Sequence, residues 1–256
     1  MLLAIDVGNT QTVLGLFNED GLRAHWRLST DGSRSADEWT ACLAAFLAIK
    51  GIDRGAVHDA ILCSVVPPLT GTIVQMIRSY FGKQPLEVGP GTKTGIRILY
   101  DNPLEVGADR IANSVAALDR TGGPAIVIDF GTATTFDALS DRSEYLGGVI
   151  VPGLSISAEA LFSRAAKLPH VEVRKPPRII GRNTIHSIQS GLYHGYGAMI
   201  RGMLEAIKTE MGNDPKVIAT GGLSEVLSDH LHGVDAVDPH LTLEGLRLIH
   251  SKNRPA

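Results

Sequence analysis

The amino-acid sequence predicts an α/β protein made of two similar domains, each built on a mixed β-sheet. The first observation is a repeated motif: LLAIDVGNTQT at residues 2–12 and IVIDFGTATT at residues 126–135 both read as an apolar strand ending in Asp-x-Gly. The second is that each motif is followed by two more strand-like segments and then by helical periodicity. Two matching motifs half a chain apart favour an internal duplication over two unrelated tight turns.

The elements are expected in the same order in both halves. We place the domain boundary between residues 118 and 119, which gives domains 1–118 and 119–256, and we expect a cleft between them in which one ligand contacts both Asp-x-Gly turns. Beyond the two motifs, the expected strands are residues 12–17, 22–28, 60–66, 135–140, 144–151 and 216–220, and the expected helices are 36–50, 106–118, 155–166, 185–209 and 241–250.

Composition and charge exclude several classes of protein. Apolar residues make up 44% and charged residues 20% of the 256 residues, as in ordinary globular proteins, and a net charge of −3 argues against a nucleic-acid-binding face. The sequence contains no uncharged apolar run of the roughly 18 residues that a membrane span needs, and it starts without a signal peptide, so we expect a cytoplasmic protein. Cys42 and Cys63 lie in apolar contexts and are expected to be buried free thiols rather than a disulfide.

The two Asp-x-Gly turns are suited to binding anions. Gly8 and Gly131 permit tight turns whose N–H groups converge on negative oxygens, and nearby threonine hydroxyls add donors, which favours phosphate as the ligand. Asp6 and Asp129 would repel phosphate unless a cation intervenes, so they are candidate ligands of Mg²⁺ or a monovalent ion. The alternative is that each aspartate only caps its own loop. The threonines in question are Thr10, Thr12, Thr132, Thr134 and Thr135.

A second polar cluster, YDNPLEVGADRIAN at residues 100–113, leads from a turn into a helix. Asp109 at the start of this helix can accept the proton of a substrate hydroxyl, and the adjacent Arg110 can hold a carboxylate or phosphate through paired N–H bonds. The alternative is that Asp109 only interacts with the helix dipole. The sequence has no P-loop, no G-x-G-x-x-G after the first strand, no protein-kinase catalytic loop and no H-E-x-x-H zinc site, so phosphate binding requires another architecture.

Taken in order, the motifs resemble those of the type III pantothenate kinase family, and the resemblance spans the chain. It rests on DVGNT near the start, Tyr100-x-x-Pro103-x-x-Val106-Gly107-Ala108-Asp109-Arg110, DFGTAT at residues 129–134, Leu146-Gly147-Gly148 with Pro152-Gly153, Gly181-x-Asn183-Thr184, Gly191-x-x-x-Gly195, Thr220-Gly221-Gly222 and the closing LTLEGLRLIH. Any one piece is weak, whereas the ordered set is specific.

The resemblance implies a duplicated actin/hexokinase-like (ribonuclease H-like) fold and the ATP-dependent phosphorylation of pantothenate to 4'-phosphopantothenate, the first step of coenzyme A biosynthesis. It implies Asp109 as the catalytic base, Asp129 as ligand of a monovalent cation (K⁺ or NH₄⁺), and Asp6 as a ligand of the Mg²⁺ that accompanies ATP. The implied ATP-binding residues are Asp6, Val7, Gly8, Asn9, Thr10, Gln11, Thr12, Val13 and Thr132, and the implied pantothenate-binding residues are Tyr100, Gly107, Ala108, Asp109, Arg110 and Thr184.

The resemblance also implies a homodimer. Small residues at helical spacing, at positions 191, 195, 198 and 202, would allow close approach of a partner subunit or, equally, of another helix of the same chain. Val13 departs from the family pattern, in which some members have a lysine after the Asn-Thr pair, and this reduces the fixed positive charge near the phosphates. Two other functions stay open from the residues: a noncatalytic transcription accessory factor of the same family, and a kinase for another small acceptor, for which Arg110 favours an anion.

Overall fold

The computed structural model describes residues 1–165, 168–222 and 233–254, which divide into two compact units. The first unit comprises Met1–Ile96, Tyr100–Ala116 and Leu241–Ala256, and the second comprises Arg97–Leu99 and Ala117–His240. This division differs from a single boundary between residues 118 and 119, because the last segment of the chain packs within the first unit. Among the described residues, no helix combines the length and the apolar character that a membrane crossing requires.

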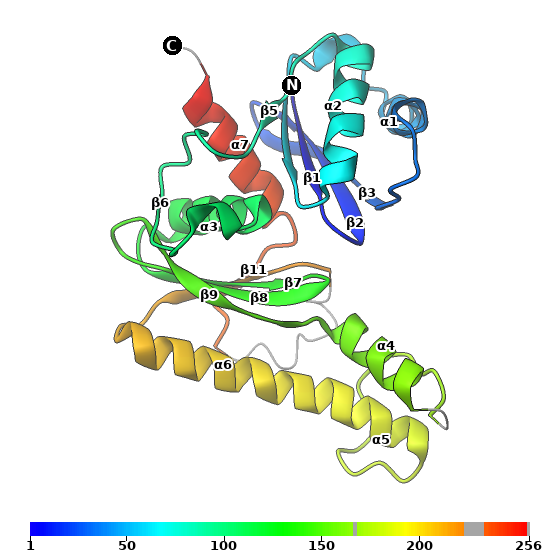
Figure 1. Cartoon of the computed structure of the whole chain (residues 1–256), viewed down its shortest axis with the longest axis vertical. Helices are drawn as coiled ribbons and strands as arrows, with labels where there is room; N and C mark the ends of the chain where they lie inside the picture. The colour runs from blue at the N-terminus through cyan, green and yellow to red at the C-terminus, as the bar shows by residue number, and fades with distance from the viewer. Residues whose placement is uncertain (166–167, 223–232, 255–256) are drawn as a thin grey trace. The chain divides into compact units, whose positions relative to one another are not determined.

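The sheet of the first unit contains five strands in the order β3-β2-β1-β4-β5. Figure 1 labels β1, β2, β3 and β5 of this sheet. β1 pairs antiparallel with β2 and parallel with β4, and β2 pairs antiparallel with β3, so the sheet is mixed as predicted. β5 adds a parallel edge strand to β4. The strands are β1 (Leu2–Val7), β2 (Gln11–Asn18), β3 (Gly21–Ser29), β4 (Asp59–Ser64) and β5 (Leu86–Glu87).

Helices cover both faces of this sheet, because alternate residues of the central strands are buried on opposite sides. Leu3 and Ile5 of β1 belong to a core that includes residues of α1 (Ala36–Ile49) and α2 (Pro67–Phe81). Leu2 and Ala4 belong to a second core with residues of α3 (Ala108–Thr121) and α7 (Leu241–Asn253). α1 begins with a capping box between Ser35 and Glu38. Two short 3₁₀ turns, Arg54–Ala56 and Pro103–Glu105, complete the regular structure.

α7 holds α3 in place within the first unit. At their contact, a methyl group on Gly245 would collide with the backbone carbonyl of Ala112, so only glycine permits this approach. The Thr242 hydroxyl donates a hydrogen bond to Asn113 Oδ1 over 2.8 Å, and Asn113 is fully buried. The closing helix therefore fixes the position of α3, whose first turn carries Asp109.

The sheet of the second unit contains six strands in the order β11-β10-β7-β8-β9-β6. β7, β8 and β9 are antiparallel neighbours, while β10 lies parallel to β7, β11 parallel to β10, and β6 parallel to β9. The strands are β6 (Arg97–Ile98), β7 (Ala125–Phe130), β8 (Ala133–Leu139), β9 (Glu144–Pro152), β10 (Lys216–Thr220) and β11 (Ala236–Val237).

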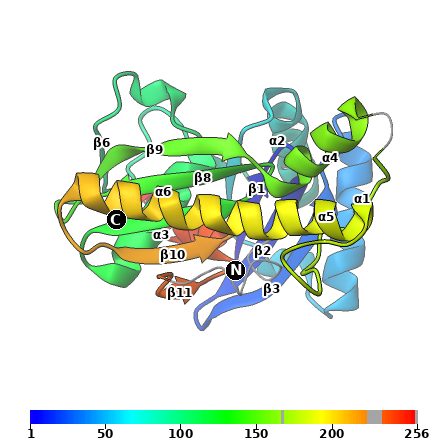
Figure 2. The ribbon, with the colours of Figure 1, turned by 90° about the horizontal axis from the view of Figure 1, so that it is seen from below.

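The described residues of the second unit also form the helices α4, α5 and α6. α5 (Thr184–Ser190), a π-helical segment (Gly191–Gly195) and α6 (Tyr196–Met211) run as one long rod, which Figure 2 shows along its length. Ile200 and Leu204 of α6 pack with Ile126 and Ile128 of β7 in the core of this unit. α4 (Leu154–Arg164) ends before residue 166, the expected end of this helix, which lies outside the described residues.

The predicted duplication is confirmed by the strand orders. β3-β2-β1-β4 of the first unit corresponds to β9-β8-β7-β10 of the second, with the same parallel and antiparallel pairings. Even the irregularities match, since the register shifts near the end of β2 (Leu16/Phe17) and near the end of β8 (Ala138/Leu139). The same local sequence pattern has therefore produced the same four-stranded arrangement twice.

Candidate active site

The first Asp-x-Gly turn, between β1 and β2, is held by backbone and hydroxyl contacts. The Gly8 N–H donates to the Gln11 carbonyl over 3.1 Å, and the Thr30 hydroxyl donates to the Gly8 carbonyl over 2.7 Å. Thr12 Oγ1 lies 2.9 Å from Thr30 Oγ1, and Thr12 is fully buried. Its hydroxyl therefore supports the turn, whereas Asn9, Thr10 and Gln11 are exposed. The Val7 side chain belongs to the core and Val13 is half-buried.

Asp6 and Asp109 act on the same buried thiol. Asp6 at the end of β1 is the register partner of Cys63 on β4, whose Sγ donates a hydrogen bond to Asp6 Oδ1 over 3.1 Å. Burial raises the pKa of the Cys63 thiol well above its usual value, and the negative charges of Asp6 and Asp109 raise it further. The thiol is therefore protonated at neutral pH, and Cys63 is a free cysteine as expected.

Asp109 lies in the first turn of α3, in an environment that suits a general base. Burial raises the pKa of its carboxyl, while the hydrogen bond from the Arg110 N–H to Oδ1, 2.8 Å long, and the charge of the Arg110 guanidinium oppose the rise. The carboxylate lies over Gly107, because a methyl group there would collide with Asp109 Oδ1. A partly desolvated carboxylate of raised pKa accepts a proton more readily than an exposed one.

The other predicted substrate residues of the first unit surround this turn in sequence. Arg110 is 8% exposed, and its carbonyl accepts a hydrogen bond from the Ser114 hydroxyl over 2.7 Å. Ala108 is the first residue of α3, and half-buried Tyr100 lies just before the 3₁₀ turn that leads into this helix. The first unit thus contains Asp6, Cys63 and Asp109 as a cluster, with Gly107 and Arg110 attached to it.

The second Asp-x-Gly turn, between β7 and β8, is shorter by one residue. Gly131 N–H donates to the Ala133 carbonyl over 3.1 Å, and Thr132 is exposed beside it. The Tyr196 hydroxyl donates to Thr134 Oγ1 over 2.7 Å, so buried Thr134 supports this turn as Thr12 supports the first. A Cβ atom on Gly221, which has φ +91°, would lie 2.7 Å from Asp129 Oδ1. Glycine thus lets the backbone after β10 reach the Asp129 carboxylate.

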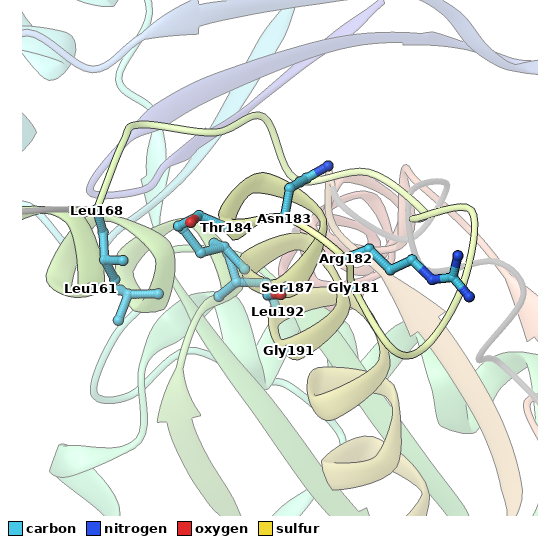
Figure 3. A pocket seen from close by; sticks show the side chains of 10 residues that line it. Leu161, Leu168, Gly181, Arg182, Asn183, Thr184, Ser187, Gly191 and Leu192 are labelled. Atoms are coloured by element: carbon cyan, nitrogen blue, oxygen red, sulfur yellow. The ribbon is translucent and has the colours of Figure 1, made fainter.

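Thr184 lies elsewhere in the second unit, in a cavity of about 660 Å³ (Figure 3). It is the first residue of α5, whose N-cap Asn183 accepts a hydrogen bond from the His186 N–H over 2.8 Å. The cavity is also lined by Leu161 of α4 and Leu192 of the π-helical segment. Thr184 is therefore placed among apolar and polar side chains at a helix start, where a hydroxyl can donate to a ligand.

Sequence comparison decides the family. The sequence profile of type III pantothenate kinase matches residues 2–206 of this chain. The chain belongs to the type III pantothenate kinase family. A type III pantothenate kinase of Anaeromyxobacter sp. (strain Fw109-5) is 53% identical over 254 residues, covering 99% of this chain and 100% of the relative. One of Moorella thermoacetica is 50% identical over 253 residues, with the same coverage.

The kinase accordingly phosphorylates pantothenate with ATP in coenzyme A biosynthesis, and the predicted family, enzyme class and reaction are confirmed. Solved structures agree on the fold. The activator of 2-hydroxyisocaproyl-CoA dehydratase from Clostridium difficile, with bound ADPNP, has a TM-score of 0.56 at 10% identity over 100% of this chain and 98% of that one. A protein described as a candidate Baf family transcriptional activator from Campylobacter jejuni has a TM-score of 0.59 at 18% identity, covering 98% of each chain. At these identities the likeness concerns the fold alone, which is the predicted duplicated actin/hexokinase-like fold.

Three residues that support the site are absent from the predicted site residues: Cys63, Thr30 and Gly245. Cys63 was expected only as a buried thiol, although parallel β1 and β4 necessarily bring their carboxyl ends together beside Asp6. Thr30 carries no local signal, because its contact with Gly8 depends on the pairing of β2 with β3. Gly245 does carry a local sequence signal, because a glycine inside a helical pattern often marks close packing.

Proposed function

We propose that phosphoryl transfer to pantothenate takes place at the carboxylate pair of the first unit, Asp6 and Asp109. The observation that supports this is their shared influence on Cys63, since two carboxylates near one buried group concentrate negative charge at the carboxyl end of β1. Such a charge is costly without a compensating cation or proton. The divalent ion that accompanies ATP would supply the cation, and the acceptor hydroxyl would supply the proton during phosphoryl transfer.

In this proposal Asp109 is the catalytic base. A carboxylate does not deprotonate an alcohol in the ground state, so its role is to orient the hydroxyl and take the proton late, as the new P–O bond forms. Burial supports that role by raising the pKa of Asp109. Arg110 binds the carboxylate of pantothenate through its guanidinium. Tyr100, Gly107, Ala108 and Thr184 complete the proposed pantothenate site.

The proposed ATP site is the turn formed by residues 6–13, together with Thr132 of the second unit. Exposed Asn9, Thr10 and Gln11 offer N–H and hydroxyl groups to phosphate oxygens. Val7 and Thr12 are buried, and so they contribute through the backbone and by supporting the turn. Half-buried Val13 stands where some family members have a lysine, so less fixed positive charge faces the phosphates in this proposal.

We further propose that Asp6 holds Mg²⁺ and that Asp129 holds K⁺ or NH₄⁺. No group of three or more histidine, cysteine, aspartate or glutamate side chains gathers as metal ligands within the described ranges. Mg²⁺ that accompanies ATP uses one or two carboxylates plus phosphate oxygens, and both aspartates offer hard oxygen ligands. When bound, these cations neutralise charge on the phosphates.

A homodimer is proposed from the surface of the second unit. Cβ atoms on Gly191, Gly195 and Gly202 would meet no atom within 4 Å in the described part of the chain, apart from their own helix and neighbours, so no helix among those described residues packs closely against them. Ile179 and Ile180 are 68% and 78% exposed nearby in sequence. Gly195→Leu is expected to convert a dimer to monomers, as measured by light scattering.

We place the kinase in the cytoplasm. Its free cysteines, Cys42 and Cys63, suit that reducing compartment.

A coupled ADP-release assay with ATP, Mg²⁺ and pantothenate tests the cation assignment. We expect turnover in potassium or ammonium buffer and at least about tenfold less when sodium replaces it. Asp129→Asn should remove most of this potassium dependence, because Asn lacks the charge that holds the ion. Equal turnover in potassium and sodium would contradict the monovalent site.

A further inference from the structure

We propose that Cys63 is a positioning residue, whose thiol holds the Asp6 carboxylate in one orientation for binding the magnesium-bound nucleotide. This inference rests on the role of Asp6 given under Proposed function. Cys63 has no contact with substrate in the proposal; it acts through Asp6. A neutral donor fixed on one carboxylate oxygen restricts rotation of the group and directs the other oxygen to its ligand.

The geometry carries this assignment. Cys63 lies opposite Asp6 in the parallel register of β1 and β4, so the two side chains project from adjacent strands on the same face. Its Sγ donates to Asp6 Oδ1 over 3.1 Å. The residue is 1% exposed, and an S–H group, a weak donor in water, is more effective where water does not compete.

The second unit repeats the arrangement with a different donor. Thr220 on β10 is the register partner of Asp129, as Cys63 is of Asp6, and it is also buried, at 2% exposed. A side chain able to donate a hydrogen bond therefore stands beside the strand-end aspartate in both halves. Packing alone would be satisfied at either place by an apolar residue such as the valines and isoleucines of the same strands.

The experiment compares variants of Cys63 in two backgrounds. Cys63→Ala removes the donor, Cys63→Ser restores one, and Cys63→Val fills the volume without a donor should the alanine variant fail to fold. Cys42→Ala, on α1, is the matched control for loss of a cysteine. Each is combined with Asp6→Ala, and the measurements are the Kd for Mg·ATP by titration calorimetry, the KM and kcat, and the melting temperature.

We expect Cys63→Ala or Cys63→Val to weaken Mg·ATP binding about tenfold, as a lost buried hydrogen bond to a charged group does, and Cys63→Ser to stay within about threefold of the parent. In the Asp6→Ala background, Cys63→Ala should change the Kd by less than about twofold, because the group it positions is gone. The proposal is overturned if Cys63→Ser is as weak as Cys63→Ala, or if the effect is equally large in both backgrounds. It also falls if Cys63→Ala or Cys63→Val binds as the parent does.

The experiment distinguishes failure of the positioning role of Cys63 from failure of the proposed role of Asp6 in binding Mg²⁺. Should Asp6→Ala alone leave Mg·ATP binding intact, the role of Asp6 is wrong and the inference falls with it. Should Asp6→Ala abolish binding while the Cys63 variants bind normally, Asp6 keeps its role and only the positioning by Cys63 is wrong. Neither outcome alters the pantothenate kinase activity that the family establishes.

Discussion

The two Asp-x-Gly turns occupy equivalent places in duplicated sheets, and a backbone hydrogen bond closes each of them, but different groups pack beside them. Beside the first, the Cys63 thiol donates to Asp6 and the Thr30 hydroxyl donates to the Gly8 carbonyl. Beside the second, the backbone also comes close: Gly221, with φ +91°, lies so near that a Cβ atom would be 2.6 Å from both the N and O atoms of Phe130. The strands are therefore equivalent in the two halves, while the residues that pack beside each turn differ: Cys63 within β4 and Thr30 after β3 in the first, and Gly221 after β10 in the second.

Because of this difference, substitutions near the two turns should affect different properties, activity near the first and stability near the second. A change of Asp109 near the first turn should alter activity with little loss of stability, because burial already disfavours the charged form of this carboxyl in the folded chain. Changes of glycine near the second turn should alter stability first, because the displaced atoms belong to the backbone. The predictions below set one half against the other.

The largest expected effect is on turnover at the first turn. Asp109→Asn keeps the size of the side chain but removes the base, so we expect kcat to fall about a thousandfold while pantothenate affinity stays within about threefold. Steady-state kinetics and titration calorimetry with pantothenate measure the two quantities. Asp119→Asn, at an exposed position on the same helix, is the control. A proportionate loss of affinity and turnover would make Asp109 a binding residue instead.

Gly221→Ala is the corresponding test of the second turn. Its positive φ and the collision with the Phe130 backbone together should cost about 3 kcal/mol or more of unfolding free energy. Gly8→Ala in the first turn is the matched comparison: its Cβ would lie 3.0 Å from the Gln11 carbonyl, so about 1 kcal/mol is expected. Urea denaturation gives both values. Equal losses would mean that the two turns are held in the same way.

A smaller effect is expected from Gly107→Ala, where a side chain rather than the backbone must yield. The added methyl group collides with Asp109 Oδ1 and displaces the carboxylate, so kcat should fall about tenfold or somewhat more, since misplacement of a catalytic group by about 1 Å costs up to a hundredfold. The melting temperature should change little. Unchanged kcat in a folded variant would show that Asp109 need not lie over Gly107.

The parts of this architecture that sequence predicts are the local ones. The Asp-x-Gly motifs, their strands and the helix that starts near Asp109 follow from periodicity and turn chemistry within short windows. The assignment of residues 241–256 to the first unit does not, because it depends on the fit of Gly245 against Ala112, which lie far apart in the chain. The hydrogen bond between Cys63 and Asp6 depends likewise on the pairing of β1 with β4.

The smallest expected effect concerns the pH dependence of stability in α7, the helix that the first unit takes from the end of the chain. Burial lowers the pKa of His250 below its usual 6.5, with the nearby charge of Asp59 opposing the shift and that of Arg254 adding to it. The unfolded chain therefore binds this proton more readily than the folded one. The stability linked to neutral His250 is fully present above pH 6.5 and decreases as the pH falls from there to the folded pKa. One proton limits the slope to about 1.4 kcal/mol per pH unit.

The variant His250→Gln removes this titration. Its difference in unfolding free energy from the parent should be constant above pH 6.5 and should shift in favour of the variant at lower pH. A difference independent of pH from 5 to 8, measured by urea denaturation, would mean that His250 titrates alike in both states, because only unequal proton uptake can make stability depend on pH.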